Sequence, residues 1–304
     1  MKKLDKKALL VYLGFIGPGL LVYLLIVAYP IIYSVLLSFS DFNPNRGGGW
    51  NFVGLLQYST MFKDPAFWHA LKNNMIVVGI SVFGQIPIGF MLAYILYRRL
   101  VKSTSFFQTM VFLPNFLSTI VIGTLWKKLF SADGPASVII QLFTGNPNAQ
   151  FDAMLKPETV MFPIGFALIW IYTGFYMIIF LANLQKVNSS VIEAAKIDGA
   201  TEFQIFSKII VPVLSGTILV STILAIAGSL RGFDLIFSIT TQGLQRQNAE
   251  VLPIFMYRTA FQNYSNEMRF AYGSAISNAI VIISVSLIMF SNWVSAKVGG
   301  GEEN

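Results

Sequence analysis

Residue types that carry out covalent chemistry are scarce in this chain. It has no cysteine and a single histidine, His69, which has no second imidazole to share a metal with and is expected to be structural. The sequence contains no G-x-x-x-x-G-K-[ST] loop for nucleotide phosphates, no G-x-S-x-G elbow and no H-E-x-x-H zinc motif. We therefore predict no catalytic, cofactor-binding or metal site, and no enzyme activity in this chain alone.

Two clusters of aromatic, hydroxyl-bearing and small residues could instead contact a polar solute. They interrupt long apolar stretches, and a path for a polar solute needs such side chains. The alternative is ordinary packing, because Ser, Thr and Gly also bring membrane helices together. Arg231 and Asp234, which adjoin the second cluster, are expected to form a structural ion pair. The candidates for a substrate path are Tyr172, Thr173 and Tyr176 in one cluster, and Gly228, Ser229 and Gly232 in the other.

The composition identifies the environment of these clusters. Of the 304 residues, 55% are hydrophobic and only 12% are charged, with a mean hydropathy of +0.66. Soluble domains carry about 25% charged residues. Six long stretches contain no charged residue, and each exceeds the ~20 apolar residues that a helix needs to cross a bilayer. These stretches are 8–39, 73–97, 103–126, 159–185, 209–230 and 270–296.

Charge spacing therefore predicts an all-α integral membrane protein with six transmembrane helices, forming one transmembrane domain over residues 1–304. Backbone groups in lipid must be satisfied within their own element, so these segments should be helical. Six buried helices of a soluble core are a poor alternative, since such helices rarely lack a charged face. The predicted spans are 9–37, 74–97, 104–127, 160–184, 209–230 and 271–295.

The segments between the spans carry further information. Basic residues are denser in 1–7, 98–102, 186–208 and 297–304, so both termini are expected on the cytoplasmic side of the membrane. The first span is too long for the apolar region of a signal peptide, and Pro18 and Pro30 predict a kink or break within it. The uncharged run 134–151 is expected to be an outer loop with one short helix. The net charge of +7 reflects topology, because no basic face for nucleic acid is present.

Apart from Lys127 at the outer end of the third, the six predicted spans contain no Asp, Glu, Lys or Arg. Proton-coupled carriers place ionisable groups inside the membrane, where they bind the driving proton. Because this chain offers none, its driving energy is expected to come from a partner protein.

The loop at 188–208 is the most distinctive segment. Capping boxes are predicted for Ser190 with Glu193 and for Thr201 with Gln204, and Gly199 is expected to end the first of two short helices. Phe203 and Phe206 lie three residues apart and are expected to share one face, so that the pair of helices could dock onto another protein. The alternative is a plain helical hairpin that connects two spans.

This loop resembles the EAA loop of permeases in binding-protein-dependent ABC importers. The string E-A-A-x-x-D-G-A begins at Glu193, and Gln204, Phe206, Ile209, Pro212 and Leu214 follow it. In that family the loop forms a coupling helix that inserts into the cytoplasmic ATPase. The resemblance implies that the contact with the ATPase is made by Glu193, Ala194, Ala195, Asp198, Gly199 and Ala200.

The resemblance covers nearly the whole chain and is closest to the carbohydrate-type subfamily. Residues 52–58 and 64–68, then 112–114 and 233–237, fit its patterns, whereas 240–245 lacks the second Gly and the Pro of T-x-G-G-P. It implies import of a mono- or oligosaccharide across the inner membrane, with substrate contacts in the spans on either side of the loop. The implied partners are a second permease subunit in a heterodimer, an ABC ATPase dimer that binds ATP and Mg, an extracytoplasmic solute-binding protein and membrane lipid.

Two other functions remain open at this point. An ABC permease for another solute, such as a glycerol phosphate or an amino acid, would keep the loop, although the first outer loop argues against amino acids. A self-contained carrier or channel would need neither the loop nor a partner.

Overall fold

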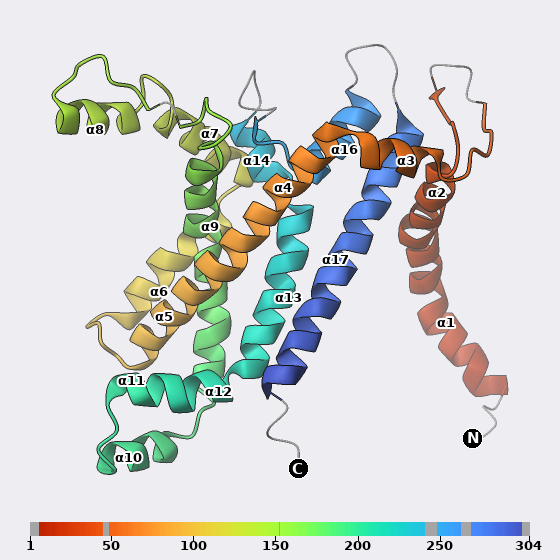
Figure 1. Cartoon of the computed structure of the whole chain (residues 1–304). Coiled ribbons are helices and arrows are strands. Elements are labelled where there is room, and N and C mark those ends of the chain that lie inside the picture. Colours follow the sequence, from red (N-terminus) through yellow and green to blue (C-terminus); the bar gives the residue numbers. More distant parts are fainter. Residues whose placement is uncertain (1–5, 45–48, 152, 241–247, 263–268, 300–304) are drawn as a thin grey trace. The chain divides into compact units, whose positions relative to one another are not determined.

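A computed structural model describes residues 6–44, 49–151, 153–240, 248–262 and 269–299 (Figure 1). The regular secondary structure of the described residues is helical, apart from one isolated bridge between Ser40 and Phe52, which confirms the all-α fold class. Backbone contacts divide the chain into two compact units. Unit 1 comprises Met1–Phe67 and Phe255–Val281, and unit 2 comprises Trp68–Ile254 and Ile282–Asn304. Residues 241–245 of the altered T-x-G-G-P stretch lie outside the described residues.

Unit 1 is built around the first apolar segment. Its side chains from 14 onward are mostly exposed, and Phe15 is 86% exposed, as expected for a helix whose surroundings are apolar. Two hydrogen bonds fix α3 against the first turns of α17: Tyr272 donates to Asp64 Oδ2 at 2.8 Å, and Asn278 donates to Tyr58 Oη at 3.2 Å. The elements of this unit are α1 (Lys6–Tyr23), η1 (Leu24–Ala28), α2 (Tyr29–Ser38), α3 (Leu56–Lys63) and parts of α4, α16 (Leu252–Phe261) and α17 (Phe270–Gly299).

Unit 2 contains the remaining helices. They are α4 (Pro65–Ile80), η3 (Ser81–Gln85), α5 (Ile86–Tyr97), α6 (Thr104–Phe112), η4 (Leu113–Phe116), α7 (Thr119–Leu129), α8 (Pro135–Thr144), α9 (Met161–Leu184), α10 (Ser189–Ile197), α11 (Glu202–Ile205), η5 (Phe206–Ile210), α12 (Val211–Val213), α13 (Ser215–Arg231) and α14 (Asp234–Ile239). The short helix α8 agrees with the helix expected within 134–151.

Helix α9 is the centre of unit 2, and close approach of its neighbours depends on small residues. Gly89 of α5 faces α9 so closely that a Cβ there would lie 2.9 Å from Tyr176 Cβ and 3.0 Å from Thr173 O. Phe90 and Phe180 stack beside this contact with ring centroids 4.7 Å apart. Gly174 abuts the backbone of α6 at Val111 in the same way. Small residues at helix contacts are typical of membrane bundles, where packing replaces the hydrophobic effect.

Three π turns in the described chain share one relation to proline. η1, η3 and η5 end two residues before Pro30, Pro87 and Pro212, respectively. Proline has no N–H to donate, and its ring crowds the carbonyl of the preceding turn. A π turn widens the helix at this point and accommodates the ring. Pro30 therefore interrupts the α-helix as predicted, whereas α1 continues past Pro18.

Within the described part of the chain, four helices are long and apolar enough to cross a membrane, and six spans result if each of two bent pairs counts as one. The four are Gly14–Ser38, Pro65–Tyr97, Met161–Leu184 and Phe270–Lys297. The third and fifth predicted spans are not straight: α6 with η4 meets α7 at 96°, and α11 to α12 meets α13 at 68°. The first bend follows Pro114, where Leu117 and Ser118 are extended, and the second follows Pro212.

Candidate functional site

A pocket of about 250 Å³ lies within unit 2. Its wall collects five of the six residues that the sequence singled out for a substrate path: Tyr172, Tyr176, Gly228, Ser229 and Gly232. The sixth, Thr173, lies outside the lining, on the side of α9 that meets α5, where its carbonyl approaches Gly89. Its side chain is buried, and Oγ1 has no hydrogen-bond partner among the described residues.

The opposite wall comes from the π turn η3, which sequence reasoning missed. Ser81 and Gln85 of this turn line the pocket, with Val77 of α4 beside them. Both polar side chains are nearly inaccessible, at 4% and 2% exposure. The signal that could have revealed them was Gln85 inside an uncharged apolar stretch, two residues before Pro87.

Hydrogen bonds fix the geometry of the wall. Ser229 Oγ donates to Ser81 Oγ at 2.8 Å and so joins α13 to η3. Gln85 Nε2 donates to the carbonyl of Leu168 at 3.2 Å and joins η3 to α9. Asn74 donates to the carbonyl of Ser229 at 3.1 Å and accepts from the amide of Leu252 at 2.8 Å. Three of the elements that line the pocket, α13, η3 and α9, are therefore joined by buried polar groups.

Two charged residues complete the lining, Arg231 at the end of α13 and Asp234 at the start of α14. The ion pair that the sequence predicted between them is not present in the described chain. The extended Gly232, at φ −61° and ψ 98°, turns the chain between them, so the two side chains belong to different helices. The pocket thus presents one positive and one negative group beside two tyrosines, hydroxyls and an amide.

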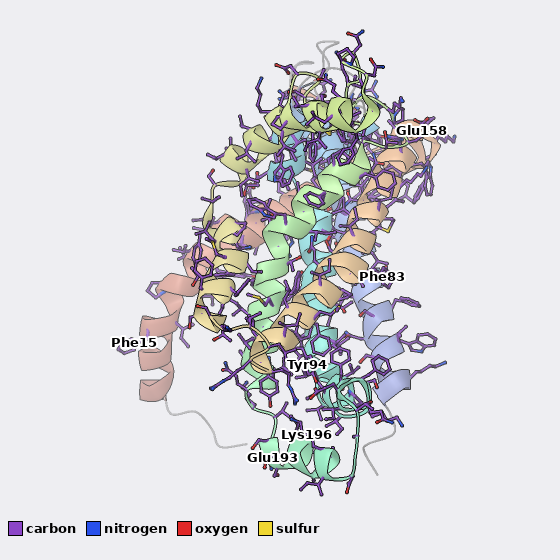
Figure 2. The ribbon with its side chains drawn as sticks, turned by 90° about the vertical axis from the view of Figure 1, so that its left-hand side faces the viewer. Phe15, Phe83, Tyr94, Glu158, Glu193 and Lys196 are labelled. Carbon is purple, nitrogen blue, oxygen red and sulfur yellow. The ribbon has the colours of Figure 1, made fainter. Side chains whose placement is uncertain are left out.

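The loop at 188–208 forms the end of unit 2 that carries α10 and α11. Figure 2 shows Glu193 and Lys196 on α10 at this end, with Tyr94 of α5 close by. The predicted capping box of Thr201 is confirmed: Thr201 N donates to Gln204 Oε1 at 2.7 Å, and Gln204 N donates to Thr201 Oγ1 at 3.3 Å. Gly199 has φ +80° and ends α10 in the left-handed conformation, also as predicted.

Two local expectations for this loop were wrong. α10 is capped by Asn188, whose Oδ1 accepts from Ser190 N at 3.0 Å, in place of a box between Ser190 and Glu193. Phe203 and Phe206 do not share a face, since Phe203 is 76% exposed while Phe206 packs on Phe90 and Tyr94.

The residues that the resemblance assigns to the ATPase contact form an accessible surface. Glu193, Ala194, Asp198 and Gly199 are exposed, while Ala195 and Ala200 are half-buried against the core. The loop is nevertheless anchored, because Ile192 and Ile205 are 6% and 1% exposed and pack into the cluster around Phe180 and Leu184. The buried residues Ile192 and Ile205 form the base of the loop, and the exposed residues from Glu193 to Gly199 form its edge. A loop with a fixed base and an edge that faces solvent is suited to docking onto another protein.

Helix α5 holds the loop through charged and polar side chains as well. Glu202, the first residue of α11, forms an ion pair with Arg98, which caps the end of α5. Tyr94 Oη donates to the other carboxylate oxygen of Glu202 at 3.0 Å. The same helix continues into η3 at the pocket, so one element contacts both candidate sites.

The family model "Binding-protein-dependent transport system inner membrane component" matches residues 85–298. The chain belongs to this family. It is therefore a permease component of an ABC-type import system, and the matched region includes the loop and all of the pocket lining except Val77 and Ser81.

Individual relatives agree along nearly their whole lengths. The probable ABC transporter permease protein PH1215 of Pyrococcus horikoshii is 30% identical over 280 residues, which are 90% of this chain and 92% of that protein. The lactose transport system permease protein LacF of Rhizobium radiobacter is 30% identical and covers 93% of each chain. A chain in the crystal structure of a bacterial ABC transporter for the acidic polysaccharide alginate aligns with a TM-score of 0.81, 22% identity, and 96% and 97% coverage. That likeness confirms the permease fold.

Proposed function

We propose that this chain is the membrane-spanning subunit of an ATP-driven importer that moves a carbohydrate, a mono- or oligosaccharide, across the cytoplasmic membrane. Family membership supports the import system, and the relative named for lactose supports the substrate class. The observation that carries the proposal is the pocket, whose lining combines aromatic and polar side chains. These are Tyr172, Tyr176, Ser229, Ser81 and Gln85, and a hydrogen bond joins Ser229 to Ser81. Apolar and aromatic walls with a few placed polar groups are what a small polar ligand requires.

The charges of the pocket favour a neutral sugar over a phosphate ester. Arg231 alone would attract an anion, but Asp234 lies in the same lining and opposes it. A doubly charged phosphate would need several donors without a competing carboxylate. A glycerol phosphate is therefore the second candidate.

We propose the loop at 188–208 as the contact with the ATPase, through Glu193, Ala194, Ala195, Asp198, Gly199 and Ala200. Exposure of the edge and burial of the base support this role. ATP and Mg would be bound by the partner ATPase, and the remaining partners would be a second, different permease subunit and an extracytoplasmic binding protein. In this arrangement the loop and both termini lie on the cytoplasmic side.

Isolation of the tagged chain from its native membranes in a mild detergent tests this proposal. Mass spectrometry should identify a P-loop ATPase and a second permease with the chain, and uptake of a labelled sugar should require all three. Uptake of glycerol phosphate but not of sugars would select the second candidate. Recovery of the chain alone, with uptake independent of ATP, would identify a self-contained carrier and contradict the proposal.

A further inference from the structure

Helix α8 presents its apolar face away from the protein. Val138, Ile139, Leu142 and Phe143 are 50%, 53%, 80% and 87% exposed. At spacings of one, four and five residues they lie on a single face of the helix. A helix on a water-exposed surface would turn such a face inward.

The polar side chains of α8 point the opposite way and are used within the protein. Ser137, fully buried, donates to the carbonyl of Ser131 at 3.2 Å and accepts from the amide of Phe151 at 2.8 Å. Gln141 Nε2 donates to the carbonyl of Ala149 at 3.0 Å. These hydrogen bonds fix the rotation of α8 about its axis. The apolar face is therefore held in its exposed position by the packing of the polar side chains.

The position of α8 indicates what covers this face. Figure 1 shows α8 apart from the helices around α9, near the end of α9 that lies opposite α10 and α11, with its axis across that of α9. The helix carries no charged residue, whereas Lys128 lies in the last turn of α7 and Asp133 in the segment between α7 and α8. The neighbouring α7 also exposes apolar side chains, Ile120, Val121 and Leu125, which are 66%, 59% and 52% accessible.

We infer that α8 lies in the lipid interface, parallel to the membrane, with its apolar face inserted into the leaflet opposite the loop at 188–208. An exposed apolar helix face that follows a span with exposed apolar side chains of its own fits the boundary between headgroups and acyl chains. A docked protein would need hydrogen-bonding groups at the rim of the contact, and those of Ser137 and Gln141 are directed inward. This role goes beyond the proposed function and does not depend on which solute is carried.

The absence of native cysteine in the chain makes a direct test practical. Single variants Phe143→Cys and Ile139→Cys place a nitroxide label on the apolar face, one turn apart. Asn148→Cys, in the exposed segment after α8, is the matched control. Each labelled permease is assembled with its partner subunits in nanodiscs of phosphatidylethanolamine and phosphatidylglycerol. Electron paramagnetic resonance then measures the accessibility of the label to oxygen, which enters lipid, and to a nickel chelate, which stays in water.

The inference predicts an oxygen-to-nickel accessibility ratio several-fold higher at Phe143→Cys and Ile139→Cys than at Asn148→Cys. A ratio equal to that of the control would show that the face lies in water. Low accessibility to both reagents would show that another protein covers the face. Either of these results overturns the inference, and each label reports independently if the other variant fails to assemble.

Discussion

Glu202 and Arg98 form an ion pair that connects the loop at 188–208 to the helix that reaches the pocket. Arg98 ends α5, and at its other end α5 continues from η3, whose Ser81 and Gln85 line the pocket. Tyr94 strengthens the connection by donating to the second carboxylate oxygen of Glu202 at 3.0 Å. A movement imposed on the loop by a partner would therefore be passed to α5 directly and not only through the chain connection to α13.

Replacement of Arg98 by alanine should lower the coupling of ATP hydrolysis to substrate uptake more than it lowers the stability of the fold. The Glu202 side chain is 59% exposed, so water screens the ion pair and its contribution to folding is on the order of 1 kcal/mol, to which the packing of the Arg98 side chain, 12% exposed, adds. We expect substrate uptake per ATP hydrolysed to fall several-fold in reconstituted vesicles, while assembly with the partner subunits is retained. The exchanged pair, Arg98→Glu with Glu202→Arg, should recover part of the lost coupling.

The ion pair between Lys128, in the last turn of α7, and Asp133, which follows α7, provides a more exposed control at 3.0 Å. Hydrogen bonds from Ser131 and Lys128 lower the pKa of Asp133 to about 2, so this pair stays ionised in any transport assay near neutral pH. Lys128→Ala should leave the ratio of uptake to ATP hydrolysis unchanged. An equal loss in both alanine variants would show that the link from Glu202 to Arg98 has no special role.

Gly199→Val should abolish transport without preventing membrane insertion. No atom lies within 4 Å of a Cβ at this position, so the penalty comes from the left-handed backbone at φ +80°, where a side chain costs ~1–2 kcal/mol. The expected result is normal abundance in the membrane with loss of ATPase association in a pull-down. Gly199→Asn should retain more transport, because Asn tolerates this conformation better than β-branched residues.

Gly145 is the matched control for that substitution. It also ends a helix in the left-handed conformation, at φ +67°, and also has open space around it. Gly145→Val carries the same backbone strain far from the loop along the chain, so uptake should persist. Loss of transport in Gly145→Val as well would point to general instability.

Gly89→Ala should destabilise the contact between α5 and α9. A Cβ at this position would come within about 3 Å of three atoms of α9, and overpacking of this kind costs about 1–3 kcal/mol. Thermal unfolding of the purified complex should shift to lower temperature. Gly79→Ala, at a helical site with open space around it, should leave the midpoint unchanged or raise it slightly. Equal midpoints for the two variants would contradict the close packing described for Gly89.

Tyr172→Ala should raise the KM for sugar uptake, and Tyr172→Phe should raise it much less. The ring of Tyr172 is 36% exposed in the pocket lining, and an aromatic contact contributes about 0.5–1.5 kcal/mol beyond buried area. This corresponds to roughly a two- to tenfold change in KM. An unchanged KM in Tyr172→Ala would assign this residue to helix packing.

Sequence patterns predicted the structure correctly where it depends only on residues that are neighbours in the chain. The capping box of Thr201 and the left-handed turn at Gly199 depend on neighbours within four residues, and both were predictable. Asn188 took the cap expected of Ser190, because it lies one residue before the first helical turn and its carboxamide reaches the free amides there.

Features that depend on helix direction or distant contacts could not be predicted. The absence of charge identified the third and fifth spans but not their bends, because charge spacing carries no information on backbone angle. The link from Arg98 to Glu202 joins residues far apart in the sequence, and no periodic pattern marks it. Ser81 and Gln85 line the pocket from the π turn before Pro87, and although Gln85 stands out in its apolar stretch, the sequence does not show which helices it faces.

The most direct test of the central claim is photo-crosslinking from the exposed edge of α10 in native membranes. A benzophenone amino acid at Ala194, which is exposed, should yield an adduct whose partner is a P-loop ATPase by mass spectrometry. The same probe at Asn148 should yield none with that protein. An ATPase adduct from Ala194 alone would establish the loop as the coupling contact of an importer. If a fully incorporated, correctly inserted Ala194 probe gave no ATPase adduct, this assignment would be contradicted.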